Sequence, residues 1–463
     1  MPLPSATPST AKRSSAKRSS ATRSSATRSS AKLGSYAVLL VSVLALLLPV
    51  ILIERNILSH TGGNFTLPQD ESYTNIAVGK NLAFYGVWGL SKYAFQTASS
   101  SLLYPLVLVP FLFIAGAHLI LPILVNAIAA ILLLGVLQRV LRGRGLSLAA
   151  QLVTLLLVVF LSPLPLLVIS GMEYTLFLLF LALFLNAFSR PRRWRLYVFA
   201  ALLVATRYEG LVILAVASAI LLYRRQGWTA LWLSLAALLP VILFGILSLS
   251  KGGHLIPPAL LQPQGGGVYT AMIVGAILLS LLLTVPVRYE QKWLAATYQR
   301  QWMTYGIFAL IAVLRSYSSL GDVTETCINT YNQQIQAAQF VHRYYYRAGV
   351  SLNEIGAVSW FSEGRKVDLT GIANYAPRRG KERHYWSPTY TDSLSWSEGA
   401  RLAILSGPQS NTRPVGRWDK IASWNNPGNI IFYALDTASG RRLKEHLREY
   451  EKSLPAGMQV QYY

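Results

Sequence analysis

Long apolar runs separated by short basic clusters occupy the first two thirds of the chain. A membrane-spanning helix needs about 20 apolar residues, and the first run, Tyr36–Ile53, is close to that length. Repeats of AKRSS and ATRSS precede it at Ala11–Ser30, where no apolar side chain is larger than alanine. Such a segment cannot bury enough surface to offset the entropy of ordering it. Residues 1–34 are therefore predicted to form a disordered basic tail.

Basic residues predict the orientation of the spans, because Lys and Arg are enriched in cytoplasmic loops. This rule places the tail in the cytoplasm. If Leu102–Leu141 held two spans, Arg139, Arg142 and Arg144 would lie outside, so Leu102–Ala115 is predicted to be a re-entrant or interfacial helix. The rule then gives about nine spans. They are Tyr36–Ile53, Leu119–Leu141, Leu148–Ile169, Tyr174–Phe188, Leu196–Thr206, Gly210–Tyr223, Trp228–Leu249, Val268–Val285 and Met303–Leu314.

The pattern changes after Ser316, where polar helical spacing alternates with short strand-like runs. Helices are predicted at Ile328–Arg347 and Arg441–Leu454, and strands at IGAVSWF, KVDLTG, RLAILSG and NIIFYALD. Alternation of this kind favours a small α/β domain. The predicted organisation is a cytoplasmic tail (1–34), a polytopic α-helical transmembrane domain (35–315) with its first external loop at 54–118, and an extracytoplasmic α/β domain (316–463).

Composition supports an integral membrane protein. Of the 463 residues, 53% are hydrophobic and 13% are charged, which is too apolar for an ordinary soluble multidomain protein. The net charge of +23 would suit nucleic acid, but many of the basic residues sit in the tail and beside the apolar runs, where membrane topology and membrane lipids explain them. The single Cys327 excludes an internal disulfide and a cysteine-based metal site.

The acidic side chains singled out near the spans fall on the predicted external face, together with a few cations. This candidate site comprises Asp70, Glu71, Glu173, Glu209, Arg207, Lys251 and His254. Structural roles are open for each of them. Asp70 could cap a helix beginning near Ser72, and Ser170-x-x-Glu173 and Thr206-x-x-Glu209 both fit capping boxes. Arg207 and Lys251 could be snorkelling anchors, and His254 a hydrogen-bonded interfacial residue.

Several segments in the expected order resemble motifs of the GT-C glycosyltransferases, with the mycobacterial terminal arabinofuranosyltransferase branch nearest. They are DESYTNIAVGKNLAFYGVWG followed by SSSLLYP, then SGMEYTLFLLFLALFL, ATRYEGLVILA, GHLIPPALLQ and NEIGAVSWFSEGRKVDLTGIAN. The resemblance covers most of Tyr36–Asn374. The chain departs from the pattern at Glu71, where a second Asp is common, and at Pro257-Pro258, where Pro-Asn is usual.

The resemblance implies inverting transfer of a pentose or hexose from a polyprenyl-phosphate donor to an envelope polysaccharide or glycolipid, outside the cytoplasmic membrane. Asp70 would be the general base, since a hydroxyl acceptor needs one. Glu71 would orient the acceptor or share a divalent cation, Mg²⁺ or Mn²⁺, with Asp70; no other cofactor is implied. Arg207, Lys251 and His254 would bind the lipid phosphate, with Glu173 and Glu209 beside them. The alternative is a non-catalytic envelope assembly or transport protein that binds glycan through its external domain.

Overall fold

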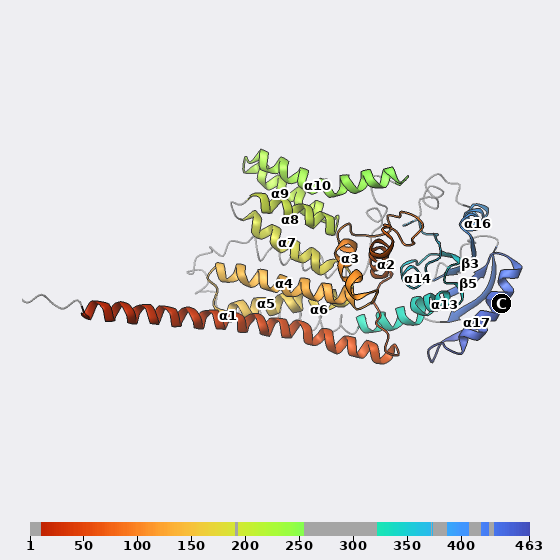
Figure 1. Cartoon of the computed structure of the whole chain (residues 1–463), viewed down its shortest axis with the longest axis horizontal. Coiled ribbons are helices and arrows are strands. Elements are labelled where there is room, and N and C mark those ends of the chain that lie inside the picture. Colours follow the sequence, from red (N-terminus) through yellow and green to blue (C-terminus); the bar gives the residue numbers. More distant parts are fainter. Residues whose placement is uncertain are drawn as a thin grey trace, which may run out of the picture.

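The computed structural model describes residues 11–189, 193–253, 322–371, 373, 387–406, 418–425 and 430–463, with the backbone alone for 11–32 (Figure 1). Two predicted spans, Val268–Val285 and Met303–Leu314, lie outside the described residues, and so does His254. The described chain consists of a mostly helical part up to residue 253 and an α/β part from residue 322 onward.

Ten helices make up the first part. They are α1 (Ala11–His60), α2 (Asp70–Tyr85), α3 (Tyr104–Ala115), α4 (Leu121–Gly143), α5 (Leu148–Leu161), α6 (Leu164–Ile169), α7 (Tyr174–Phe188), α8 (Arg193–Thr206), α9 (Gly210–Tyr223) and α10 (Gly227–Ser250). Among the described residues, three stretches are long and apolar enough to cross a membrane: Leu33–His60, Leu121–Gly143 and Gly227–Ser250. Large apolar side chains on α1 and α10, such as Leu48 and Leu243, are exposed, as expected for helices that face lipid.

The apolar helices lie side by side, and their basic ends share one side of the molecule (Figure 1). Arg142 is in the last turn of α4, α8 begins at Arg193, and Arg224 follows α9. The N-terminal part of α1 projects on this same side, whereas α2, α3 and the α/β part lie at the opposite end (Figure 1). The charge pattern read from the sequence therefore corresponds to one end of the helical bundle.

The predicted helix positions hold closely for α7 and α9, whose bounds are those predicted. One predicted span is divided, because Leu148–Ile169 forms α5 and α6 with a break at Ser162 and Pro163. A proline inside a helix removes a hydrogen bond and clashes with the preceding turn, which explains the break. The predicted disordered tail also differs from the structure, where α1 is helical from Ala11. Ala, Lys and Arg have high helix propensities, and neither Gly nor Pro interrupts residues 11–33.

A six-stranded sheet forms the centre of the α/β part. Its strands are β1 (Gly349–Leu352), β2 (Lys366–Asp368), β3 (Ala400–Leu405), β4 (Asp419–Asn425), β5 (Ile430–Ala434) and β6 (Gln459–Tyr462), and their order is β2-β1-β3-β5-β4-β6. Strand β1 pairs in parallel with β2 and β3, and the remaining pairs are antiparallel. Residues 322–330 are helical and lead into η2 (Tyr331–Ile335), and the further helices are α13 (Gln336–Tyr345), α14 (Gly356–Phe361), α16 (Pro388–Ser397) and α17 (Thr437–Glu451).

Aromatic packing builds the main core of this part. Phe340 of α13 contacts Trp424 of β4, Phe432 of β5 and Tyr450 of α17, with ring centroids 5.4–6.3 Å apart. A smaller apolar cluster gathers Leu394 of α16 against β2 and β3. The predicted strands KVDLTG, RLAILSG and NIIFYALD are confirmed as β2, β3 and β5, whereas the predicted strand IGAVSWF is wrong because it contains helix α14.

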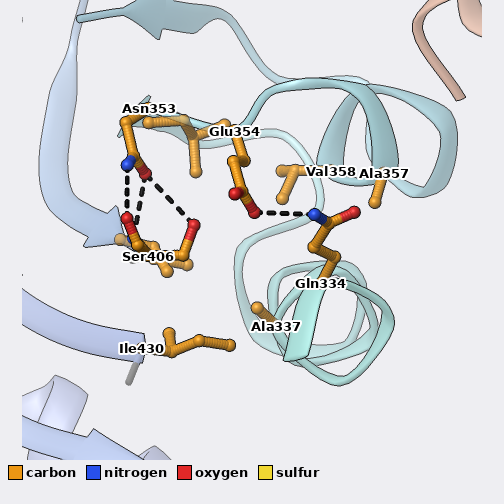
Figure 2. A pocket seen from close by; sticks show the side chains of 10 residues that line it. Gln334, Ala337, Asn353, Glu354, Ala357, Val358, Ser406 and Ile430 are labelled. Carbon is orange, nitrogen blue, oxygen red and sulfur yellow. Dashed lines mark hydrogen bonds between the residues drawn. The ribbon is translucent and has the colours of Figure 1, made fainter. Parts of the chain in front are cut away.

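The carboxyl ends of β1 and β3 lie next to each other at the point where the chain order of the sheet reverses (Figure 2). Open α/β sheets often bind ligands at such a point. Here the side chain of Asn353 exchanges hydrogen bonds with the backbone of Ser406, and Gln334 Nε2 donates to Glu354 Oε2 at 2.8 Å. The hollow that remains is about 20 Å³, little more than a water molecule needs.

Candidate functional site

Helix α2 opens with two carboxylates that point to different sides of the helix. Asp70 and Glu71 occupy its first turn, where acidic side chains interact favourably with the helix dipole. The helix ends at Gly86, whose φ of 68° and backbone N–H bonds to Asn81 and Leu82 close its last turn. Successive residues of an α-helix are about 100° apart around the axis. The two acids therefore leave the helix in different directions.

Asp70 binds the amino end of α14. Its Oδ2 accepts hydrogen bonds from the backbone N–H groups of Ile355 (3.0 Å) and Gly356 (2.9 Å), and Oδ1 accepts one from Ala357 (3.0 Å). The backbones are so close that a Cβ on Gly356 would lie 2.0 Å from the carbonyl oxygen of Asp70, so only glycine fits there. The cap predicted for Asp70 exists, but on α14 rather than on its own helix.

Burial raises the pKa of Asp70 to about 6, with Glu354 adding to the rise and the three N–H groups opposing it. These bonds join residues 285 to 287 positions apart in the chain. Asp70 therefore links helix α2 of the helical part to the α/β part. Its assignment as the general base stays a prediction.

A lysine of the same helix binds the other end of α14. Lys80 Nζ donates to the carbonyl oxygen of Trp360 at 2.5 Å and lies 5.1 Å from the centroid of the Trp360 ring. Lys366 donates to the carbonyl oxygen of Ser362 at 3.1 Å, just beyond the helix. Cations at a helix carboxyl end oppose its negative partial charge. Helix α2 thus holds both ends of α14, a role for Lys80 that the sequence pattern did not indicate.

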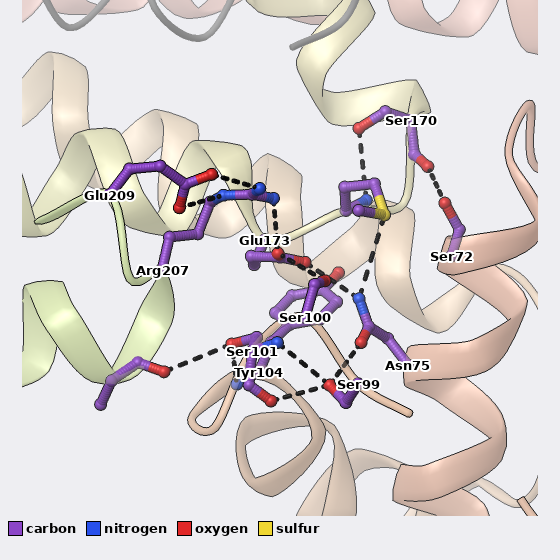
Figure 3. Close-up of polar contacts among 12 residues, drawn as sticks. Ser72, Asn75, Ser99, Ser100, Ser101, Tyr104, Ser170, Glu173, Arg207 and Glu209 are labelled. Carbon is purple, nitrogen blue, oxygen red and sulfur yellow. Dashed lines mark hydrogen bonds and ion pairs between the residues drawn. The ribbon is translucent and has the colours of Figure 1, made fainter. Parts of the chain in front are cut away.

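Arg207 and two glutamates form the second charged group, at the ends of α7, α8 and α9 (Figure 3). Arg207 Nη1 lies 2.8 Å from Glu173 Oε1, and its Nε and Nη2 bind both carboxylate oxygens of Glu209 at 3.1 and 2.7 Å. The side chains of Arg207 and Glu173 are 3% and 0% exposed, so this ion pair is inside the protein. The guanidinium also lies 4.8 Å from the centroid of the Tyr174 ring.

Polar side chains from α2 and the loop after it complete this network (Figure 3). Asn75 Nδ2 donates to Glu173 Oε2 at 2.9 Å, and the Ser100 hydroxyl donates to Glu173 Oε1 at 3.0 Å. Ser99 in turn donates to Asn75 Oδ1 at 2.6 Å, and Ser72 donates to the carbonyl oxygen of Ser170. Every acceptor of Glu173 is therefore bound. The run Ser99–Ser101 was visible in the sequence only as part of a resembling motif.

The capping roles predicted for Glu173 and Glu209 and the anchor role predicted for Arg207 are wrong. Glu173 and Glu209 stand at the N-caps of α7 and α9 without a side-chain cap bond, because Arg207 binds their carboxylates instead. Arg207 is no snorkelling anchor, since it is buried in the ion pair. The predicted topology placed these three residues on one face, and the structure adds that Arg207 binds both glutamates.

Glu71 lies on the side of α2 that faces this network. It is one helical turn before Asn75, and residues four apart share a helix face. The pKa of Glu71 is raised to about 7, first by burial and then by the charge of Glu173, and Arg207 opposes the rise. A carboxylate with a pKa near neutrality can take up a proton efficiently at physiological pH. The paired acids of the sequence are thus separated, and Glu71 rather than Asp70 joins the cluster.

Two predicted site residues, Lys251 and His254, remain to be located. Lys251 is exposed at the C-cap of α10, and within the part of the chain that the structure describes it does not join the Arg207 network. His254 lies outside the described residues. Among the residues that are described, no group of three or more His, Cys, Asp or Glu is placed to hold a metal ion.

The fold and site together define a helical protein with apolar helices that could span a membrane, joined to an α/β domain. A family model described as a domain of unknown function (DUF8728) matches residues 325–448, which lie in the α/β part. No curated protein matches the chain.

Proposed function

We propose that the protein is an integral membrane glycosyltransferase of the GT-C type that uses a polyprenyl-phosphate sugar. In this proposal the chain crosses the cytoplasmic membrane about nine times, with its N-terminus inside and its α/β domain outside. The exposed apolar faces of α1 and α10 support membrane insertion. The basic clusters at one end of the bundle and the carboxylates at the other support this orientation.

The contacts favour Glu71 over Asp70 as the general base. Three of the roughly four acceptor sites of the Asp70 carboxylate already bind backbone N–H groups, which leaves little capacity for an acceptor hydroxyl. Glu71 faces Glu173 and Arg207 with a pKa of about 7. It would take the proton of the acceptor hydroxyl as that oxygen attacks the anomeric carbon and the lipid phosphate leaves. Asp70 would then position α2 by binding α14.

The charge balance of the network favours contact with sugar hydroxyls rather than with the donor phosphate. Arg207 is bound by Glu173 and Glu209, so the three side chains together carry a net negative charge that repels phosphate. Glu209 is 36% exposed and its oxygens can accept hydroxyl groups. We assign the leaving phosphate to Lys251, at the same end of the bundle as α2. A divalent cation, Mg²⁺ or Mn²⁺, would add positive charge at the phosphate if the reaction uses one.

One observation carries the proposal: Glu71, with a pKa near neutrality, lies beside a buried Arg–Glu network at the end of the bundle opposite the basic clusters. The test uses purified protein and polyprenyl-phosphate arabinose, mannose, glucose and galactose, each with and without Mg²⁺ or Mn²⁺. Release of polyprenyl phosphate is measured with an acceptor present. Glu71→Gln should lower the rate by about 10²–10⁴-fold, the usual worth of a general base.

The control is Glu325→Gln, which removes an exposed carboxylate outside the Arg207 network, in the α/β part of the chain, and should leave the rate unchanged. Full activity of Glu71→Gln with a correctly folded protein would refute the assignment of the base. Absence of turnover with all four donors would refute the proposed glycosyltransferase activity.

A non-catalytic envelope assembly or transport role is the second candidate, and the contacts of Asp70 favour it. A scaffold needs its external domain fixed to its membrane domain, and Asp70 does this through three hydrogen bonds. The scaffold role predicts that Asp70→Asn alters glycan binding or domain docking while Glu71→Gln has no effect on either. The enzyme role predicts the larger loss of function for Glu71→Gln.

A further inference from the structure

Glu54, near the carboxyl end of α1, is a buried acid without a hydrogen-bond partner. Its side chain is 8% exposed, and neither Oε1 nor Oε2 accepts a hydrogen bond from any residue that the structure describes. The next residue, Arg55, is exposed. A carboxylate ion in apolar surroundings is costly unless it is paired, and such groups usually become neutral instead. Glu54 therefore needs a ligand that removes its charge.

The elements that pack against this end of α1 offer no cation within the described residues. Helices α5 and α6 contact α1 and contain no titratable side chain, and the two arginines of α4 lie near its carboxyl end, at the basic end of the bundle. The described groups that respond to the charge of Glu54 are Tyr73 of α2 and Cys327 of the helical segment 322–330. Burial raises the pKa of the Tyr73 phenol and of the Cys327 thiol, and the charge of Glu54 adds to both. Both side chains are therefore neutral.

Glu54 lies where α1 meets the segment that leads into the α/β part. Just beyond α1, Asn64 Nδ2 donates to the hydroxyl oxygen of Tyr331 at 3.3 Å. Cys327 is one helical turn before Tyr331, on the same face of its helix, and is fully buried. Because the charge of Glu54 acts on the Cys327 thiol, the Glu54 carboxyl faces this contact.

We propose that Glu54 binds a proton and that this proton keeps α1 in contact with residues 322–331. The protonated carboxyl is neutral and can stay buried. When its O–H bond breaks and the proton passes to solvent, the remaining ion requires hydration, so water enters the contact and separates the segment from α1. Acidic conditions therefore strengthen the contact and alkaline conditions weaken it. The proposal does not depend on the glycosyltransferase function.

Infrared spectroscopy detects this proton directly, because the carbonyl stretch of a protonated carboxyl is separate from the bands of a carboxylate. Spectra of the full-length protein are recorded at pH 6, where an ordinary glutamic acid, with a pKa of about 4.3, is almost fully ionised. Wild type minus Glu54→Gln should show the band of one protonated carboxyl. Wild type minus Glu325→Gln, which removes an exposed carboxylate from the segment 322–330, should show none.

Hydrogen exchange measures whether the proton holds the contact. The protection of the amides of residues 322–335, corrected for the intrinsic pH dependence of exchange, is compared between pH 6 and pH 9. In the wild type it should fall at least about 10-fold, since the release of one proton changes an equilibrium tenfold per pH unit. Glu54→Gln and Glu54→Leu carry no charge at any pH and should keep their protection, whereas Glu325→Gln should behave as the wild type.

Three results would overturn the proposal. The first is the absence of the carboxyl band from the difference spectrum of Glu54→Gln, and the second is the same pH dependence of protection in the wild type and in Glu54→Gln. The third is protection that depends on Na⁺ or K⁺ rather than on pH, which would show that a metal cation neutralises Glu54. Neither measurement involves a sugar donor, so failure here leaves the glycosyltransferase proposal untouched.

Discussion

The two sides of α2 use acidic residues in different ways. On the side that faces α14, Asp70 meets neutral backbone N–H groups, and its charge is stabilised by a helix end. On the side that faces the bundle, Glu71 meets other carboxylates and a guanidinium that Glu173 and Glu209 already bind. Two adjacent residues of one helix thus lie in a domain contact and in a charged cluster.

This difference indicates a structural role for Asp70 and a chemical role for Glu71. Asp70 accepts three backbone hydrogen bonds of 2.9–3.0 Å and has a pKa of about 6, whereas Glu71 has a pKa of about 7. The carboxylate whose pKa is closer to the working pH is the better general base. Asp70 and Lys80 fix α2 to the two ends of α14. The position of Glu71 on α2 therefore depends on these contacts. Four substitutions test how independent the two sides are.

The largest effect on stability should follow Arg207→Met. It leaves Glu173 buried and without its cation, and breaking a buried pair on one side costs about 3–5 kcal/mol. The free energy of unfolding, measured by denaturant titration in detergent, should fall by that amount. Arg343→Ala removes an exposed pair with Glu449 and should cost less than about 1 kcal/mol. Similar costs for the two variants would contradict the buried ion pair.

Asp70→Ala should come next. Three N–H groups at the start of α14 lose their acceptor. Since water can replace some of these charge-assisted bonds, the free energy of unfolding should fall by about 2–3 kcal/mol. Hydrogen exchange at residues 355–357 should accelerate. Asp70→Asn, which keeps one oxygen acceptor, should give an intermediate result. Unchanged exchange in Asp70→Ala would show that α14 does not depend on this contact.

Lys80→Met tests the opposite end of α14 and should have a smaller effect. The variant keeps the apolar stem against Trp360 but removes the cation from the last carbonyls, which is worth about 1 kcal/mol. Faster hydrogen exchange in residues 358–361, with residues 355–357 unaffected, would confirm that the two ends are held separately. Lys452→Met, at an exposed position after α17, is the control and should show no change.

The last test concerns the pH dependence of stability. Glu71 has a pKa of about 7 in the folded protein against 4.5 ordinarily, so the folded state keeps a proton that the unfolded state releases. The contribution of Glu71 to stability is therefore largest below pH 4.5 and is lost as pH rises through 7. Glu71→Gln should remove that part of the decline in melting temperature between pH 5 and pH 7.5. A wild-type profile that rises over this interval, or a variant profile with the same slope, would contradict the raised pKa.

Local pattern determined a large part of this protein. Apolar runs gave the bounds of α7 and α9, and their basic flanks correspond to one end of the bundle. The candidate residues Glu71, Glu173, Arg207 and Glu209 were also selected from the sequence, since charges beside apolar helices are costly and stand out against their surroundings. Hydrophobicity and charge act over a few residues, so these features need no knowledge of the fold.

Only the tertiary structure decided which side chains bind which. The helix α14 was predicted as a strand because GAVSWF is apolar and β-prone. In the folded chain Asp70 and Lys80 bind the two ends of that helix. A hydrogen bond requires two groups within about 3 Å, and the partners here are separated by more than 270 positions in the chain. The sequence supplied the acids as a pair, and the turn of a helix by about 100° per residue gave each a different partner.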